Sequence, residues 1–194
     1  MSGAHRTAGL LPVRQPRGFT LTELMAVLAI AGVLLGMAMP SLRQLIERQR
    51  LRTTANDLFA AIDLTRSQAI MRGRRVTMAP ADVLGSDWNK GWVVFVDKND
   101  NRRPDADEEI IFQQGPVASG ISIRYGFSAS PGAAYIAYNG AGRSCSANNS
   151  QAAHWGSLSV LLGEQARHIK INMLGRVRLC DPQKETDCTG VADA

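Results

Sequence analysis

An uncharged run near the N-terminus is the feature that most constrains what this chain can form. From Leu24 to Met39 no residue is charged or strongly polar. The run is slightly shorter than the ~20 residues that cross a bilayer, but it is long enough once Phe19 to Glu23 are added. The first eighteen residues contain no acidic residue and three arginines, Arg6, Arg14 and Arg17. Because basic flanks stay on the cytoplasmic side, we expect residues 19–40 to form a single transmembrane helix with a cytoplasmic N-terminus.

Three interpretations fit such a segment. A secretory signal would be cut after the apolar run, where Gly36-Met37-Ala38 offers a small-x-small site. An uncut signal anchor would stay whole. In the third interpretation a leader is removed before the apolar run and the helix remains. Glu23 favours the third, because a carboxylate in an apolar helix costs ~2.5–3.5 kcal/mol at its centre, less near an interface. The other two interpretations have no use for it.

Glu23 also fits ordinary helix-start chemistry. Thr20 and Glu23 have the spacing of a capping box, and Phe19 and Leu24 that of the flanking hydrophobic staple. A carboxylate in the first turn also suits the helix dipole. This explanation does not account for a basic leader that ends at Gly18, directly before the helix.

The segment from Arg17 to Leu24, Arg-Gly-Phe-Thr-Leu-Thr-Glu-Leu, closely resembles the class III signal of type IV pilins and type II secretion pseudopilins. The resemblance implies that a prepilin peptidase removes residues 1–18 by cutting after Gly18, and that the new N-terminal residue, Phe19, is N-methylated. It also implies that Glu23 pairs with the N-terminal charge of a neighbouring subunit, since a carboxylate in lipid needs a cationic partner. We therefore expect an inner-membrane protein with a periplasmic C-terminal domain that later enters a filament.

The rest of the chain divides into a helical part and a β part. Pro40 is expected to interrupt the helix, and residues 41–73 then carry apolar side chains at near-helical spacing up to a stop at Gly73. Residues 74–194 contain short β-like runs between Gly-, Pro- and Asn-rich turns. The runs are residues 75–79, 92–97, 109–113, 121–127, 134–138, 157–162, 167–173 and 176–180. A helix followed by short strands indicates an α+β fold with an antiparallel sheet packed on the helix, which is the pilin architecture.

A second stretch resembles a narrower group, the minor pilins and pseudopilins of the GspH/FimT type. It runs Gly91-Trp-Val-Val-Phe-Val-Asp97-Lys-Asn99-Asp-Asn101 and is followed by Glu109-Ile-Ile111. Together with the N-terminal signal, the resemblance spans most of the chain. It implies that the partners are other pilin or pseudopilin subunits.

The polar loop within this stretch has the spacing of a calcium-binding loop. Oxygen-bearing residues stand at positions one, three, five, nine and twelve: Asp97, Asn99, Asn101, Asp105 and Glu108. Arg102 stands where such loops need glycine, Arg103 adds another positive charge, and no helices flank the loop. We therefore expect a solvated turn rich in Asn and Asp and no metal site.

The three cysteines favour one disulfide and one spare thiol in an exported domain. None has CxxC spacing, and no histidine pair lies near them, so a zinc site is not expected. Cys180 and Cys188 bracket a short polar loop and are the favoured pair, and Cys145 with Cys180 is the rival.

No catalytic constellation is visible in the sequence. His154 and His168 lack an acid-and-nucleophile context, and no serine has a nucleophile-elbow frame. We therefore predict a protein that is not an enzyme and needs no cofactor. An enzyme tethered by an uncut anchor is the alternative from another class, and its activity would survive deletion of residues 1–40.

The last two strands are predicted to form a basic hairpin. Without the three leader arginines the formal charge falls from +5 to 5 − 3 = +2, so any basic surface has to be local. Alternate residues of a strand share a face, which pairs Arg176 with Arg178 and His168 with Lys170. Spaced positive charges suit phosphate contact without sequence readout, although solvent-facing Lys and Arg are ordinary on an amphipathic hairpin. The candidate DNA-contacting residues are Arg167, His168, Lys170, Arg176 and Arg178.

The hairpin also carries a family resemblance. Gly175-Arg-Val-Arg178 is similar to the Gly-Arg-x-Arg motif near the end of FimT-type minor pilins that bind DNA during natural transformation. The resemblance implies a minor pilin of a type IV pilus that helps filament assembly and contacts double-stranded DNA without sequence preference. The alternative is a minor pseudopilin of the type II protein secretion system, built in the same way.

Overall fold

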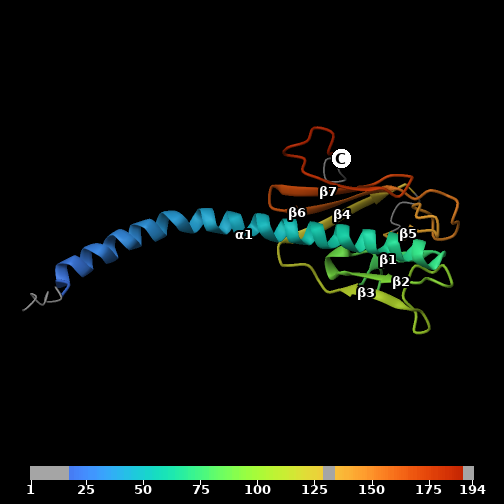
Figure 1. The fold of residues 1–194 in the computed structure, drawn as a ribbon, viewed down its shortest axis with the longest axis horizontal. Coiled ribbons are helices and arrows are strands. Elements are labelled where there is room, and N and C mark those ends of the chain that lie inside the picture. Colours follow the sequence, from blue (N-terminus) through green and yellow to red (C-terminus); the bar gives the residue numbers. More distant parts are fainter. Residues whose placement is uncertain (1–17, 129–133, 190–194) are drawn as a thin grey trace, which may run out of the picture. The chain divides into compact units, whose positions relative to one another are not determined.

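The computed structural model describes residues 18–128 and 134–189. The chain divides into two compact units, Met1–Arg43 and Gln44–Ala194. One helix, α1 (Leu21–Arg72), has residues in both units, and the strands all lie in the second (Figure 1). They are β1 (Val76–Pro80), β2 (Trp92–Phe95), β3 (Ile110–Gln114), β4 (Ile121–Phe127), β5 (Ile136–Tyr138), β6 (Gly156–Leu162), β7 (Gln165–Ile171) and β8 (Val177–Cys180), with a 3-10 turn, η1 (Trp88–Lys90), before β2.

The ends of α1 follow the expected start and stop signals. The Thr20 hydroxyl accepts a hydrogen bond from the Glu23 backbone N–H at 3.2 Å, which caps the first turn. Gly73 follows the last residue with φ of 62°, a conformation that glycine adopts at little cost. The sequence predicts two helices that meet at Pro40, whereas the structure has one helical element through this residue.

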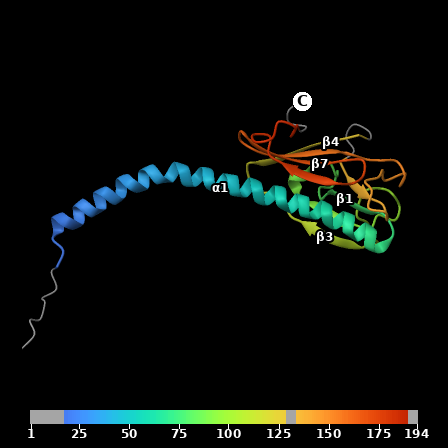
Figure 2. The same cartoon turned by 45° about the horizontal axis from the view of Figure 1, so that its top comes forward.

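The strands form two separate antiparallel sheets of four strands each. The first has the order β3-β2-β1-β5 and the second the order β4-β6-β7-β8. Residues 44–72 of α1 run along the space between the two sheets, with β1–β3 on one side and β6 and β7 on the other (Figures 1 and 2). The expectation of an antiparallel sheet on a helix is confirmed, with two sheets in place of one.

One apolar core joins this part of the helix to both sheets. It holds the helix residues Leu51, Ala55, Leu58, Ile62 and Ala69 together with inward-facing residues of each sheet, among them Met78, Val94, Leu158 and Ile169. These helix residues repeat at intervals of three, four and seven, so they form one stripe. The stripe explains why the sequence predicts an amphipathic helix here.

The two central strands of the first sheet are buried on both faces. Every residue of β1 and β2 is buried. A second apolar cluster lies behind this sheet and contains Ala79, Val93, Phe95, Tyr135, Ala137, Cys145 and Ala147. The segment from 135 to 147 therefore covers the face of the sheet that the helix does not.

The turn between β1 and β2 connects the two sheets. The Asn89 side-chain oxygen accepts a hydrogen bond from the Ile123 N–H in β4 at 2.7 Å, and Trp88 is fully buried beside it. Gly91 has φ of 97°, and a Cβ on it would lie 2.1 Å from the backbone oxygen of Gln114. The Gly91-Trp92 pair of the family-like stretch is thus a packing requirement of this turn.

Candidate functional site

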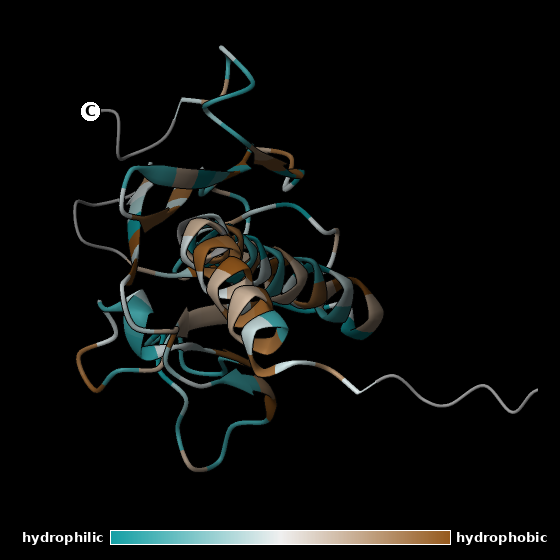
Figure 3. Cartoon of the chain, turned by 90° about the vertical axis from the view of Figure 1, so that its left-hand side faces the viewer, coloured by the Kyte–Doolittle hydropathy of each residue, from teal (hydrophilic) through white to brown (hydrophobic). Residues whose placement is uncertain are grey.

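The first candidate site is the exposed apolar segment at the start of α1. The large hydrophobic side chains from Phe19 to Met39 are 52–79% exposed, and brown patches mark them along this part of the ribbon in Figure 3. Exposed apolar surface of this extent marks contact with a membrane or another protein. Membrane or filament partners therefore have to cover this segment.

The expected processing residues stand just before this helix. Gly18 and Phe19 precede α1 and are exposed, and a Cβ at Gly18 would meet no atom within 4 Å. Glu23 lies in the first turn, also exposed. Residues 1–17 of the expected leader lie outside the described residues. Cleavage after Gly18, methylation of Phe19 and pairing of Glu23 stay predictions.

The length and composition of the described helices bear on a membrane span. No single helix is long and apolar enough to cross a bilayer, but the segments Leu21–Met37 and Ser41–Arg72 pass that test together as a bent pair.

The second candidate site is the outer face of the second sheet. The cross-strand register aligns one residue from each strand in a row: Gly126, Ser157, Lys170 and Arg178. Ile169 and Ile171 alternate with Lys170 and belong to the core. The predicted alternation of the hairpin is therefore correct, and Lys170 and Arg178 lie side by side on the exposed face.

Residues of the following loop bind two of the predicted cations, Arg178 and Lys170. Arg178 forms ion pairs with Asp187 at 2.7 Å and with Glu185 at 2.5 Å. Lys170 Nζ donates to the Asp187 carbonyl at 3.0 Å and to the Thr189 hydroxyl at 3.3 Å. The hydrogen bonds that Arg178 donates to Asp187 and then to Glu185 raise the pKa of Arg178, and its guanidinium lowers the pKa of Asp187. We call residues 181–189 the C-terminal strap.

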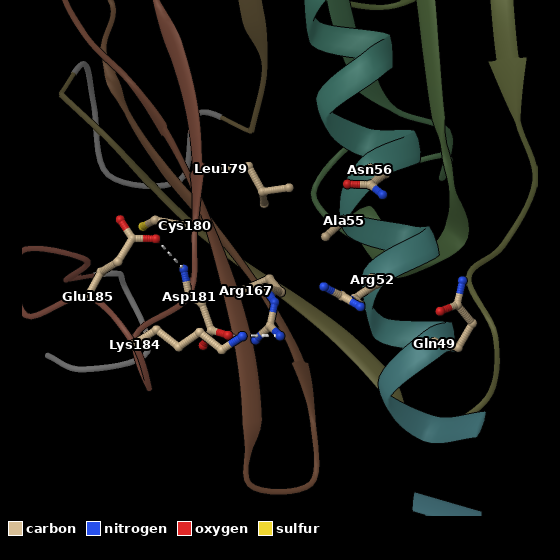
Figure 4. Close-up of a pocket in the computed structure, with 10 residues that line it drawn as sticks. All are labelled: Gln49, Arg52, Ala55, Asn56, Arg167, Leu179, Cys180, Asp181, Lys184 and Glu185. Carbon is tan, nitrogen blue, oxygen red and sulfur yellow. Dashed lines mark hydrogen bonds and ion pairs between the residues drawn. The ribbon is translucent and has the colours of Figure 1, made fainter. Parts of the chain in front are cut away.

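Two of the candidate DNA-contacting residues lie elsewhere. His168 is fully buried: Cys180 stands directly across from it in the ladder, and the disulfide to Cys188 places the strap over this part of the face. Arg167 alternates to the opposite face, where it pairs with Asp181 at 2.9 Å beside Arg52 of α1 (Figure 4). Of the five candidate DNA-contacting residues, Lys170, Arg176 and Arg178 therefore lie together on the exposed face, and their contact with DNA stays a prediction.

Arg176 is a cation of this face that makes no ion pair or side-chain hydrogen bond with any residue in the described part of the chain. It lines an open groove of about 810 Å³ together with Lys170, Arg178, Gly156 and Trp155. Trp155 is 48% exposed, whereas the other two tryptophans, Trp88 and Trp92, are buried. The sequence analysis missed Trp155, because nothing local distinguishes an exposed tryptophan from a core one.

The polar loop from Asp97 to Glu108 is held together by hydrogen bonds between its own residues. The Asp97 carboxylate accepts backbone N–H bonds from Asp100 at 2.7 Å and Arg102 at 3.1 Å, and Glu108 accepts from Lys98 at 2.6 Å. Burial raises the pKa of Asp97 despite these bonds. The carboxylates thus hold the turn itself. Among the described residues no group of three or more His, Cys, Asp and Glu side chains is arranged to hold a metal ion.

One pair of cysteines forms a disulfide and the third cysteine is free, as the sequence favours. Cys180 and Cys188 form a disulfide, and Cys145 is a free, buried thiol in the cluster behind the first sheet. Burial raises the pKa of Cys145 to about 11, so the thiol stays protonated and unreactive near neutral pH. The bridge fixes the strap beside β8.

Comparison with known proteins can now be set against this geometry. A family model described as "Type II transport protein GspH" matches residues 54–175, more than half of the chain. The chain belongs to the GspH family. The matched region covers the second half of α1, the first sheet, β4, β6 and β7. A second model, described as "Prokaryotic N-terminal methylation motif", matches residues 13–39, and together with α1 it fits a membrane-anchored pilin.

Among curated proteins, this GspH-family chain is 40% identical to "Pilin-like protein PilA1" of Thermus thermophilus over 93 residues. The match covers 48% of this chain and 56% of PilA1, so it spans little more than half of that relative.

Among solved structures, the type IV minor pilin FimU of Pseudomonas aeruginosa has the same fold. It superposes with a TM-score of 0.55 at 16% identity, over 71% of this chain and 92% of FimU. The minor pseudopilin EpsH of Vibrio cholerae gives a TM-score of 0.48 at 14% identity, over 69% and 98%. The family model and the N-terminal methylation motif together show a type IV pilin-like protein of the GspH kind, and the FimU superposition shows the fold alone. Pilins and pseudopilins are structural proteins that interact with other such subunits.

Proposed function

We propose that this protein is a minor subunit of a type IV pilus, which waits in the inner membrane on its apolar helix and enters the filament through the same helix. The observation that carries the proposal is the run of apolar side chains from Phe19 to Met39, each more than half exposed. A lipid bilayer covers such a surface before assembly, and the helices of other subunits cover it afterwards. The soluble unit, with its own core, remains outside.

The proposal includes the processing of the N-terminus. A prepilin peptidase removes residues 1–18, and Phe19 is N-methylated. Glu23 then lies in the first turn of α1, and that turn contains no basic residue. Pairing with the N-terminal charge of a neighbouring subunit stabilises the filament, because an unpaired carboxylate is costly in an apolar surrounding.

Incorporation into filaments tests this function. Glu23→Val should insert into the membrane normally but be reduced at least severalfold in sheared filaments, measured by immunoblot against the membrane fraction. Glu47→Val is the matched control, since Glu47 is an exposed residue of the same helix outside the apolar segment. Equal incorporation of Glu23→Val and the control would contradict the assembly role.

A second part of the proposal is contact with double-stranded DNA through Lys170, Arg176 and Arg178. Supporting it are the alignment of Lys170 with Arg178 on one exposed face and the absence of an acidic partner for Arg176 among the described residues. Glu185 and Asp187 offset much of the charge of this face. Affinity of one subunit should therefore be weak and salt-dependent, because few phosphates are neutralised.

A mobility-shift titration of the full chain in detergent tests the DNA contact. Binding at low salt should weaken as salt rises and be lost in Arg176→Ala/Arg178→Ala. Arg74→Ala, which removes an exposed arginine just after α1 and away from this face, serves as the control. No binding at low salt would contradict it.

The second candidate function is a minor pseudopilin of type II secretion, which the description of the matching family model favours. Deletion of the gene separates the two. Loss of pili or of transformation with normal protein secretion would support the pilus subunit, and a secretion defect with normal pili would support the pseudopilin.

A further inference from the structure

The groove beside the basic face contains more apolar surface than contact with a phosphate backbone uses. Trp155 forms one wall, and Gly156 and Ser157 follow it at the start of β6. Gly126 stands across from Ser157 in β4. Because Gly126 has no side chain and Ser157 a small one, the floor between Trp155 and β7 stays low, whereas Gly156 stands across from the core residue Ile171. The small residues and the exposed indole together create the hollow.

The opposite wall of the groove is cationic. Lys170 in β7 and Arg178 in β8 are cross-strand neighbours, and Arg176 stands two residues before Arg178 on the same face. Arg178 is paired with acidic residues, but its side chain is still 50% exposed. Exposed ion pairs contribute at most about 1 kcal/mol, so a phosphate can replace these carboxylates. An aromatic face therefore lies opposite cations across a hollow of about 810 Å³.

We infer that this groove binds single-stranded DNA, with an unstacked base lying on the Trp155 ring and the adjacent phosphates held by Arg176, Lys170 and Arg178. The inference rests on the DNA contact in the proposed function and names the form of DNA that the groove takes. Aromatic side chains beside a positive groove are the general arrangement of single-strand sites, because every base offers a π-face. Duplex DNA presents the same phosphates but keeps its bases stacked inside, so it leaves the indole uncovered.

The location of the tryptophans gives a direct measurement. Trp88 and Trp92 are fully buried in the core, so a change in intrinsic fluorescence on adding DNA reports on Trp155. The full chain in detergent would be titrated with an oligodeoxythymidylate of about ten nucleotides, a length within the range of single-strand sites. A duplex of the same length would be titrated in parallel. We expect quenching by the single strand and little quenching by the duplex.

Variants assign the effect to the ring. Trp155→Ala should weaken binding of the labelled single strand, measured by anisotropy, roughly 5- to 100-fold, as expected for loss of base stacking. Trp155→Phe should retain most of the affinity, because it keeps a stacking face. Arg176→Ala should weaken both DNA forms, whereas Arg74→Ala, outside the groove and in neither sheet, should weaken neither.

The outcomes separate this inference from the DNA contact itself. In one outcome both DNA forms bind equally, Arg176→Ala weakens the binding and Trp155→Ala does not. This outcome would overturn the single-strand site but not the DNA contact. No binding of either form would overturn both. Fluorescence quenching by a purified partner pilin, with none by DNA, would make the groove a subunit-docking surface and overturn the inference as well.

Discussion

Gly91 shows how a single backbone position fixes the turn between the first two strands. Its φ of 97° is strained for other residues, and an added Cβ would lie 2.1 Å from the Gln114 oxygen. We expect Gly91→Ala to lower the free energy of unfolding by about 3 kcal/mol or more, since it combines a strained φ with a clash against backbone. Urea denaturation measures this change.

The matched control for Gly91 is Gly163. It also has a positive φ, 57°, but a Cβ there would meet no atom within 4 Å. Gly163→Ala should therefore cost only the strained φ, about 1 kcal/mol. Equal losses for the two variants would show that the close approach to Gln114 contributes nothing.

His154 links the stability of the domain to pH. The ring is buried, its centroid lies 4.5 Å from that of the Tyr135 ring in a stacked arrangement, and its Nε2–H donates a hydrogen bond to the Tyr135 carbonyl at 3.1 Å. Burial lowers the pKa of His154 in the folded state. Below the unfolded pKa of about 6.5, the unfolded chain binds a proton that the folded chain does not. Stability should therefore fall as the pH drops below that value.

The slope of stability against pH tests this linkage. Denaturation midpoints of the wild type and His154→Phe would be compared between about pH 7.5 and 5.5, a range that brackets the unfolded pKa. Phenylalanine keeps the stacking and removes the titration, so the slope of the variant should be shallower whatever its absolute stability. Parallel slopes would rule out His154 as the titrating group.

At the residue level, alternation predicts which side chains of a strand share a face but not what covers them. The sequence predicted Lys170 and Arg178 on the exposed face correctly. It could not predict that His168, on that same face, is buried, because the covering strap depends on which cysteines pair. Nor could it predict Trp155, whose exposure comes from the small residues of two neighbouring strands.

Among the elements, the C-terminal strap controls the charge of the basic face. Asp187 holds Arg178 and Lys170 at once, through its carboxylate and its carbonyl. Asp187→Asn should release Arg178 for phosphate contact and steepen the salt dependence of duplex binding by about one counterion. Asp107→Asn is the control, since Asp107 is an exposed acid in the distant polar loop. No change relative to the control would show that the strap does not regulate this face.

A helix or strand could be predicted from the sequence where the residues that determine it lie within the segment itself. The range 121–127 was predicted without error for β4 because an apolar alternation is bounded by turn residues on both sides. The sequence predicts a helix boundary at Pro40; the structure assigns one element through it, whose segments Leu21–Met37 and Ser41–Arg72 form a bent pair, so the boundary stays a prediction. That the strands form two sheets is a non-local property, which no single run of residues encodes.

At the scale of the whole molecule, we predict where the N-terminal leader is removed. Gly18→Glu should block removal of the leader, because the resemblance places the cut after this glycine. In proportion to 21.0 kDa for 194 residues, the uncut precursor should be heavier than the mature chain by about 2 kDa. Mass spectrometry of the membrane fraction measures the difference. A mature mass identical to that of the wild type would refute the assignment of Gly18.

The position of residues 51–69 of α1 between the two sheets has a mechanical consequence. A filament subunit is pulled along its helix whenever the filament is under tension. Here the helix packs against both sheets through one continuous core. Arg72 at its end donates two hydrogen bonds to Glu109, of 2.6 and 2.7 Å. Tension would therefore shear the entire core at once and would not peel off one strand after another, and the rate of forced unfolding should be correspondingly slow.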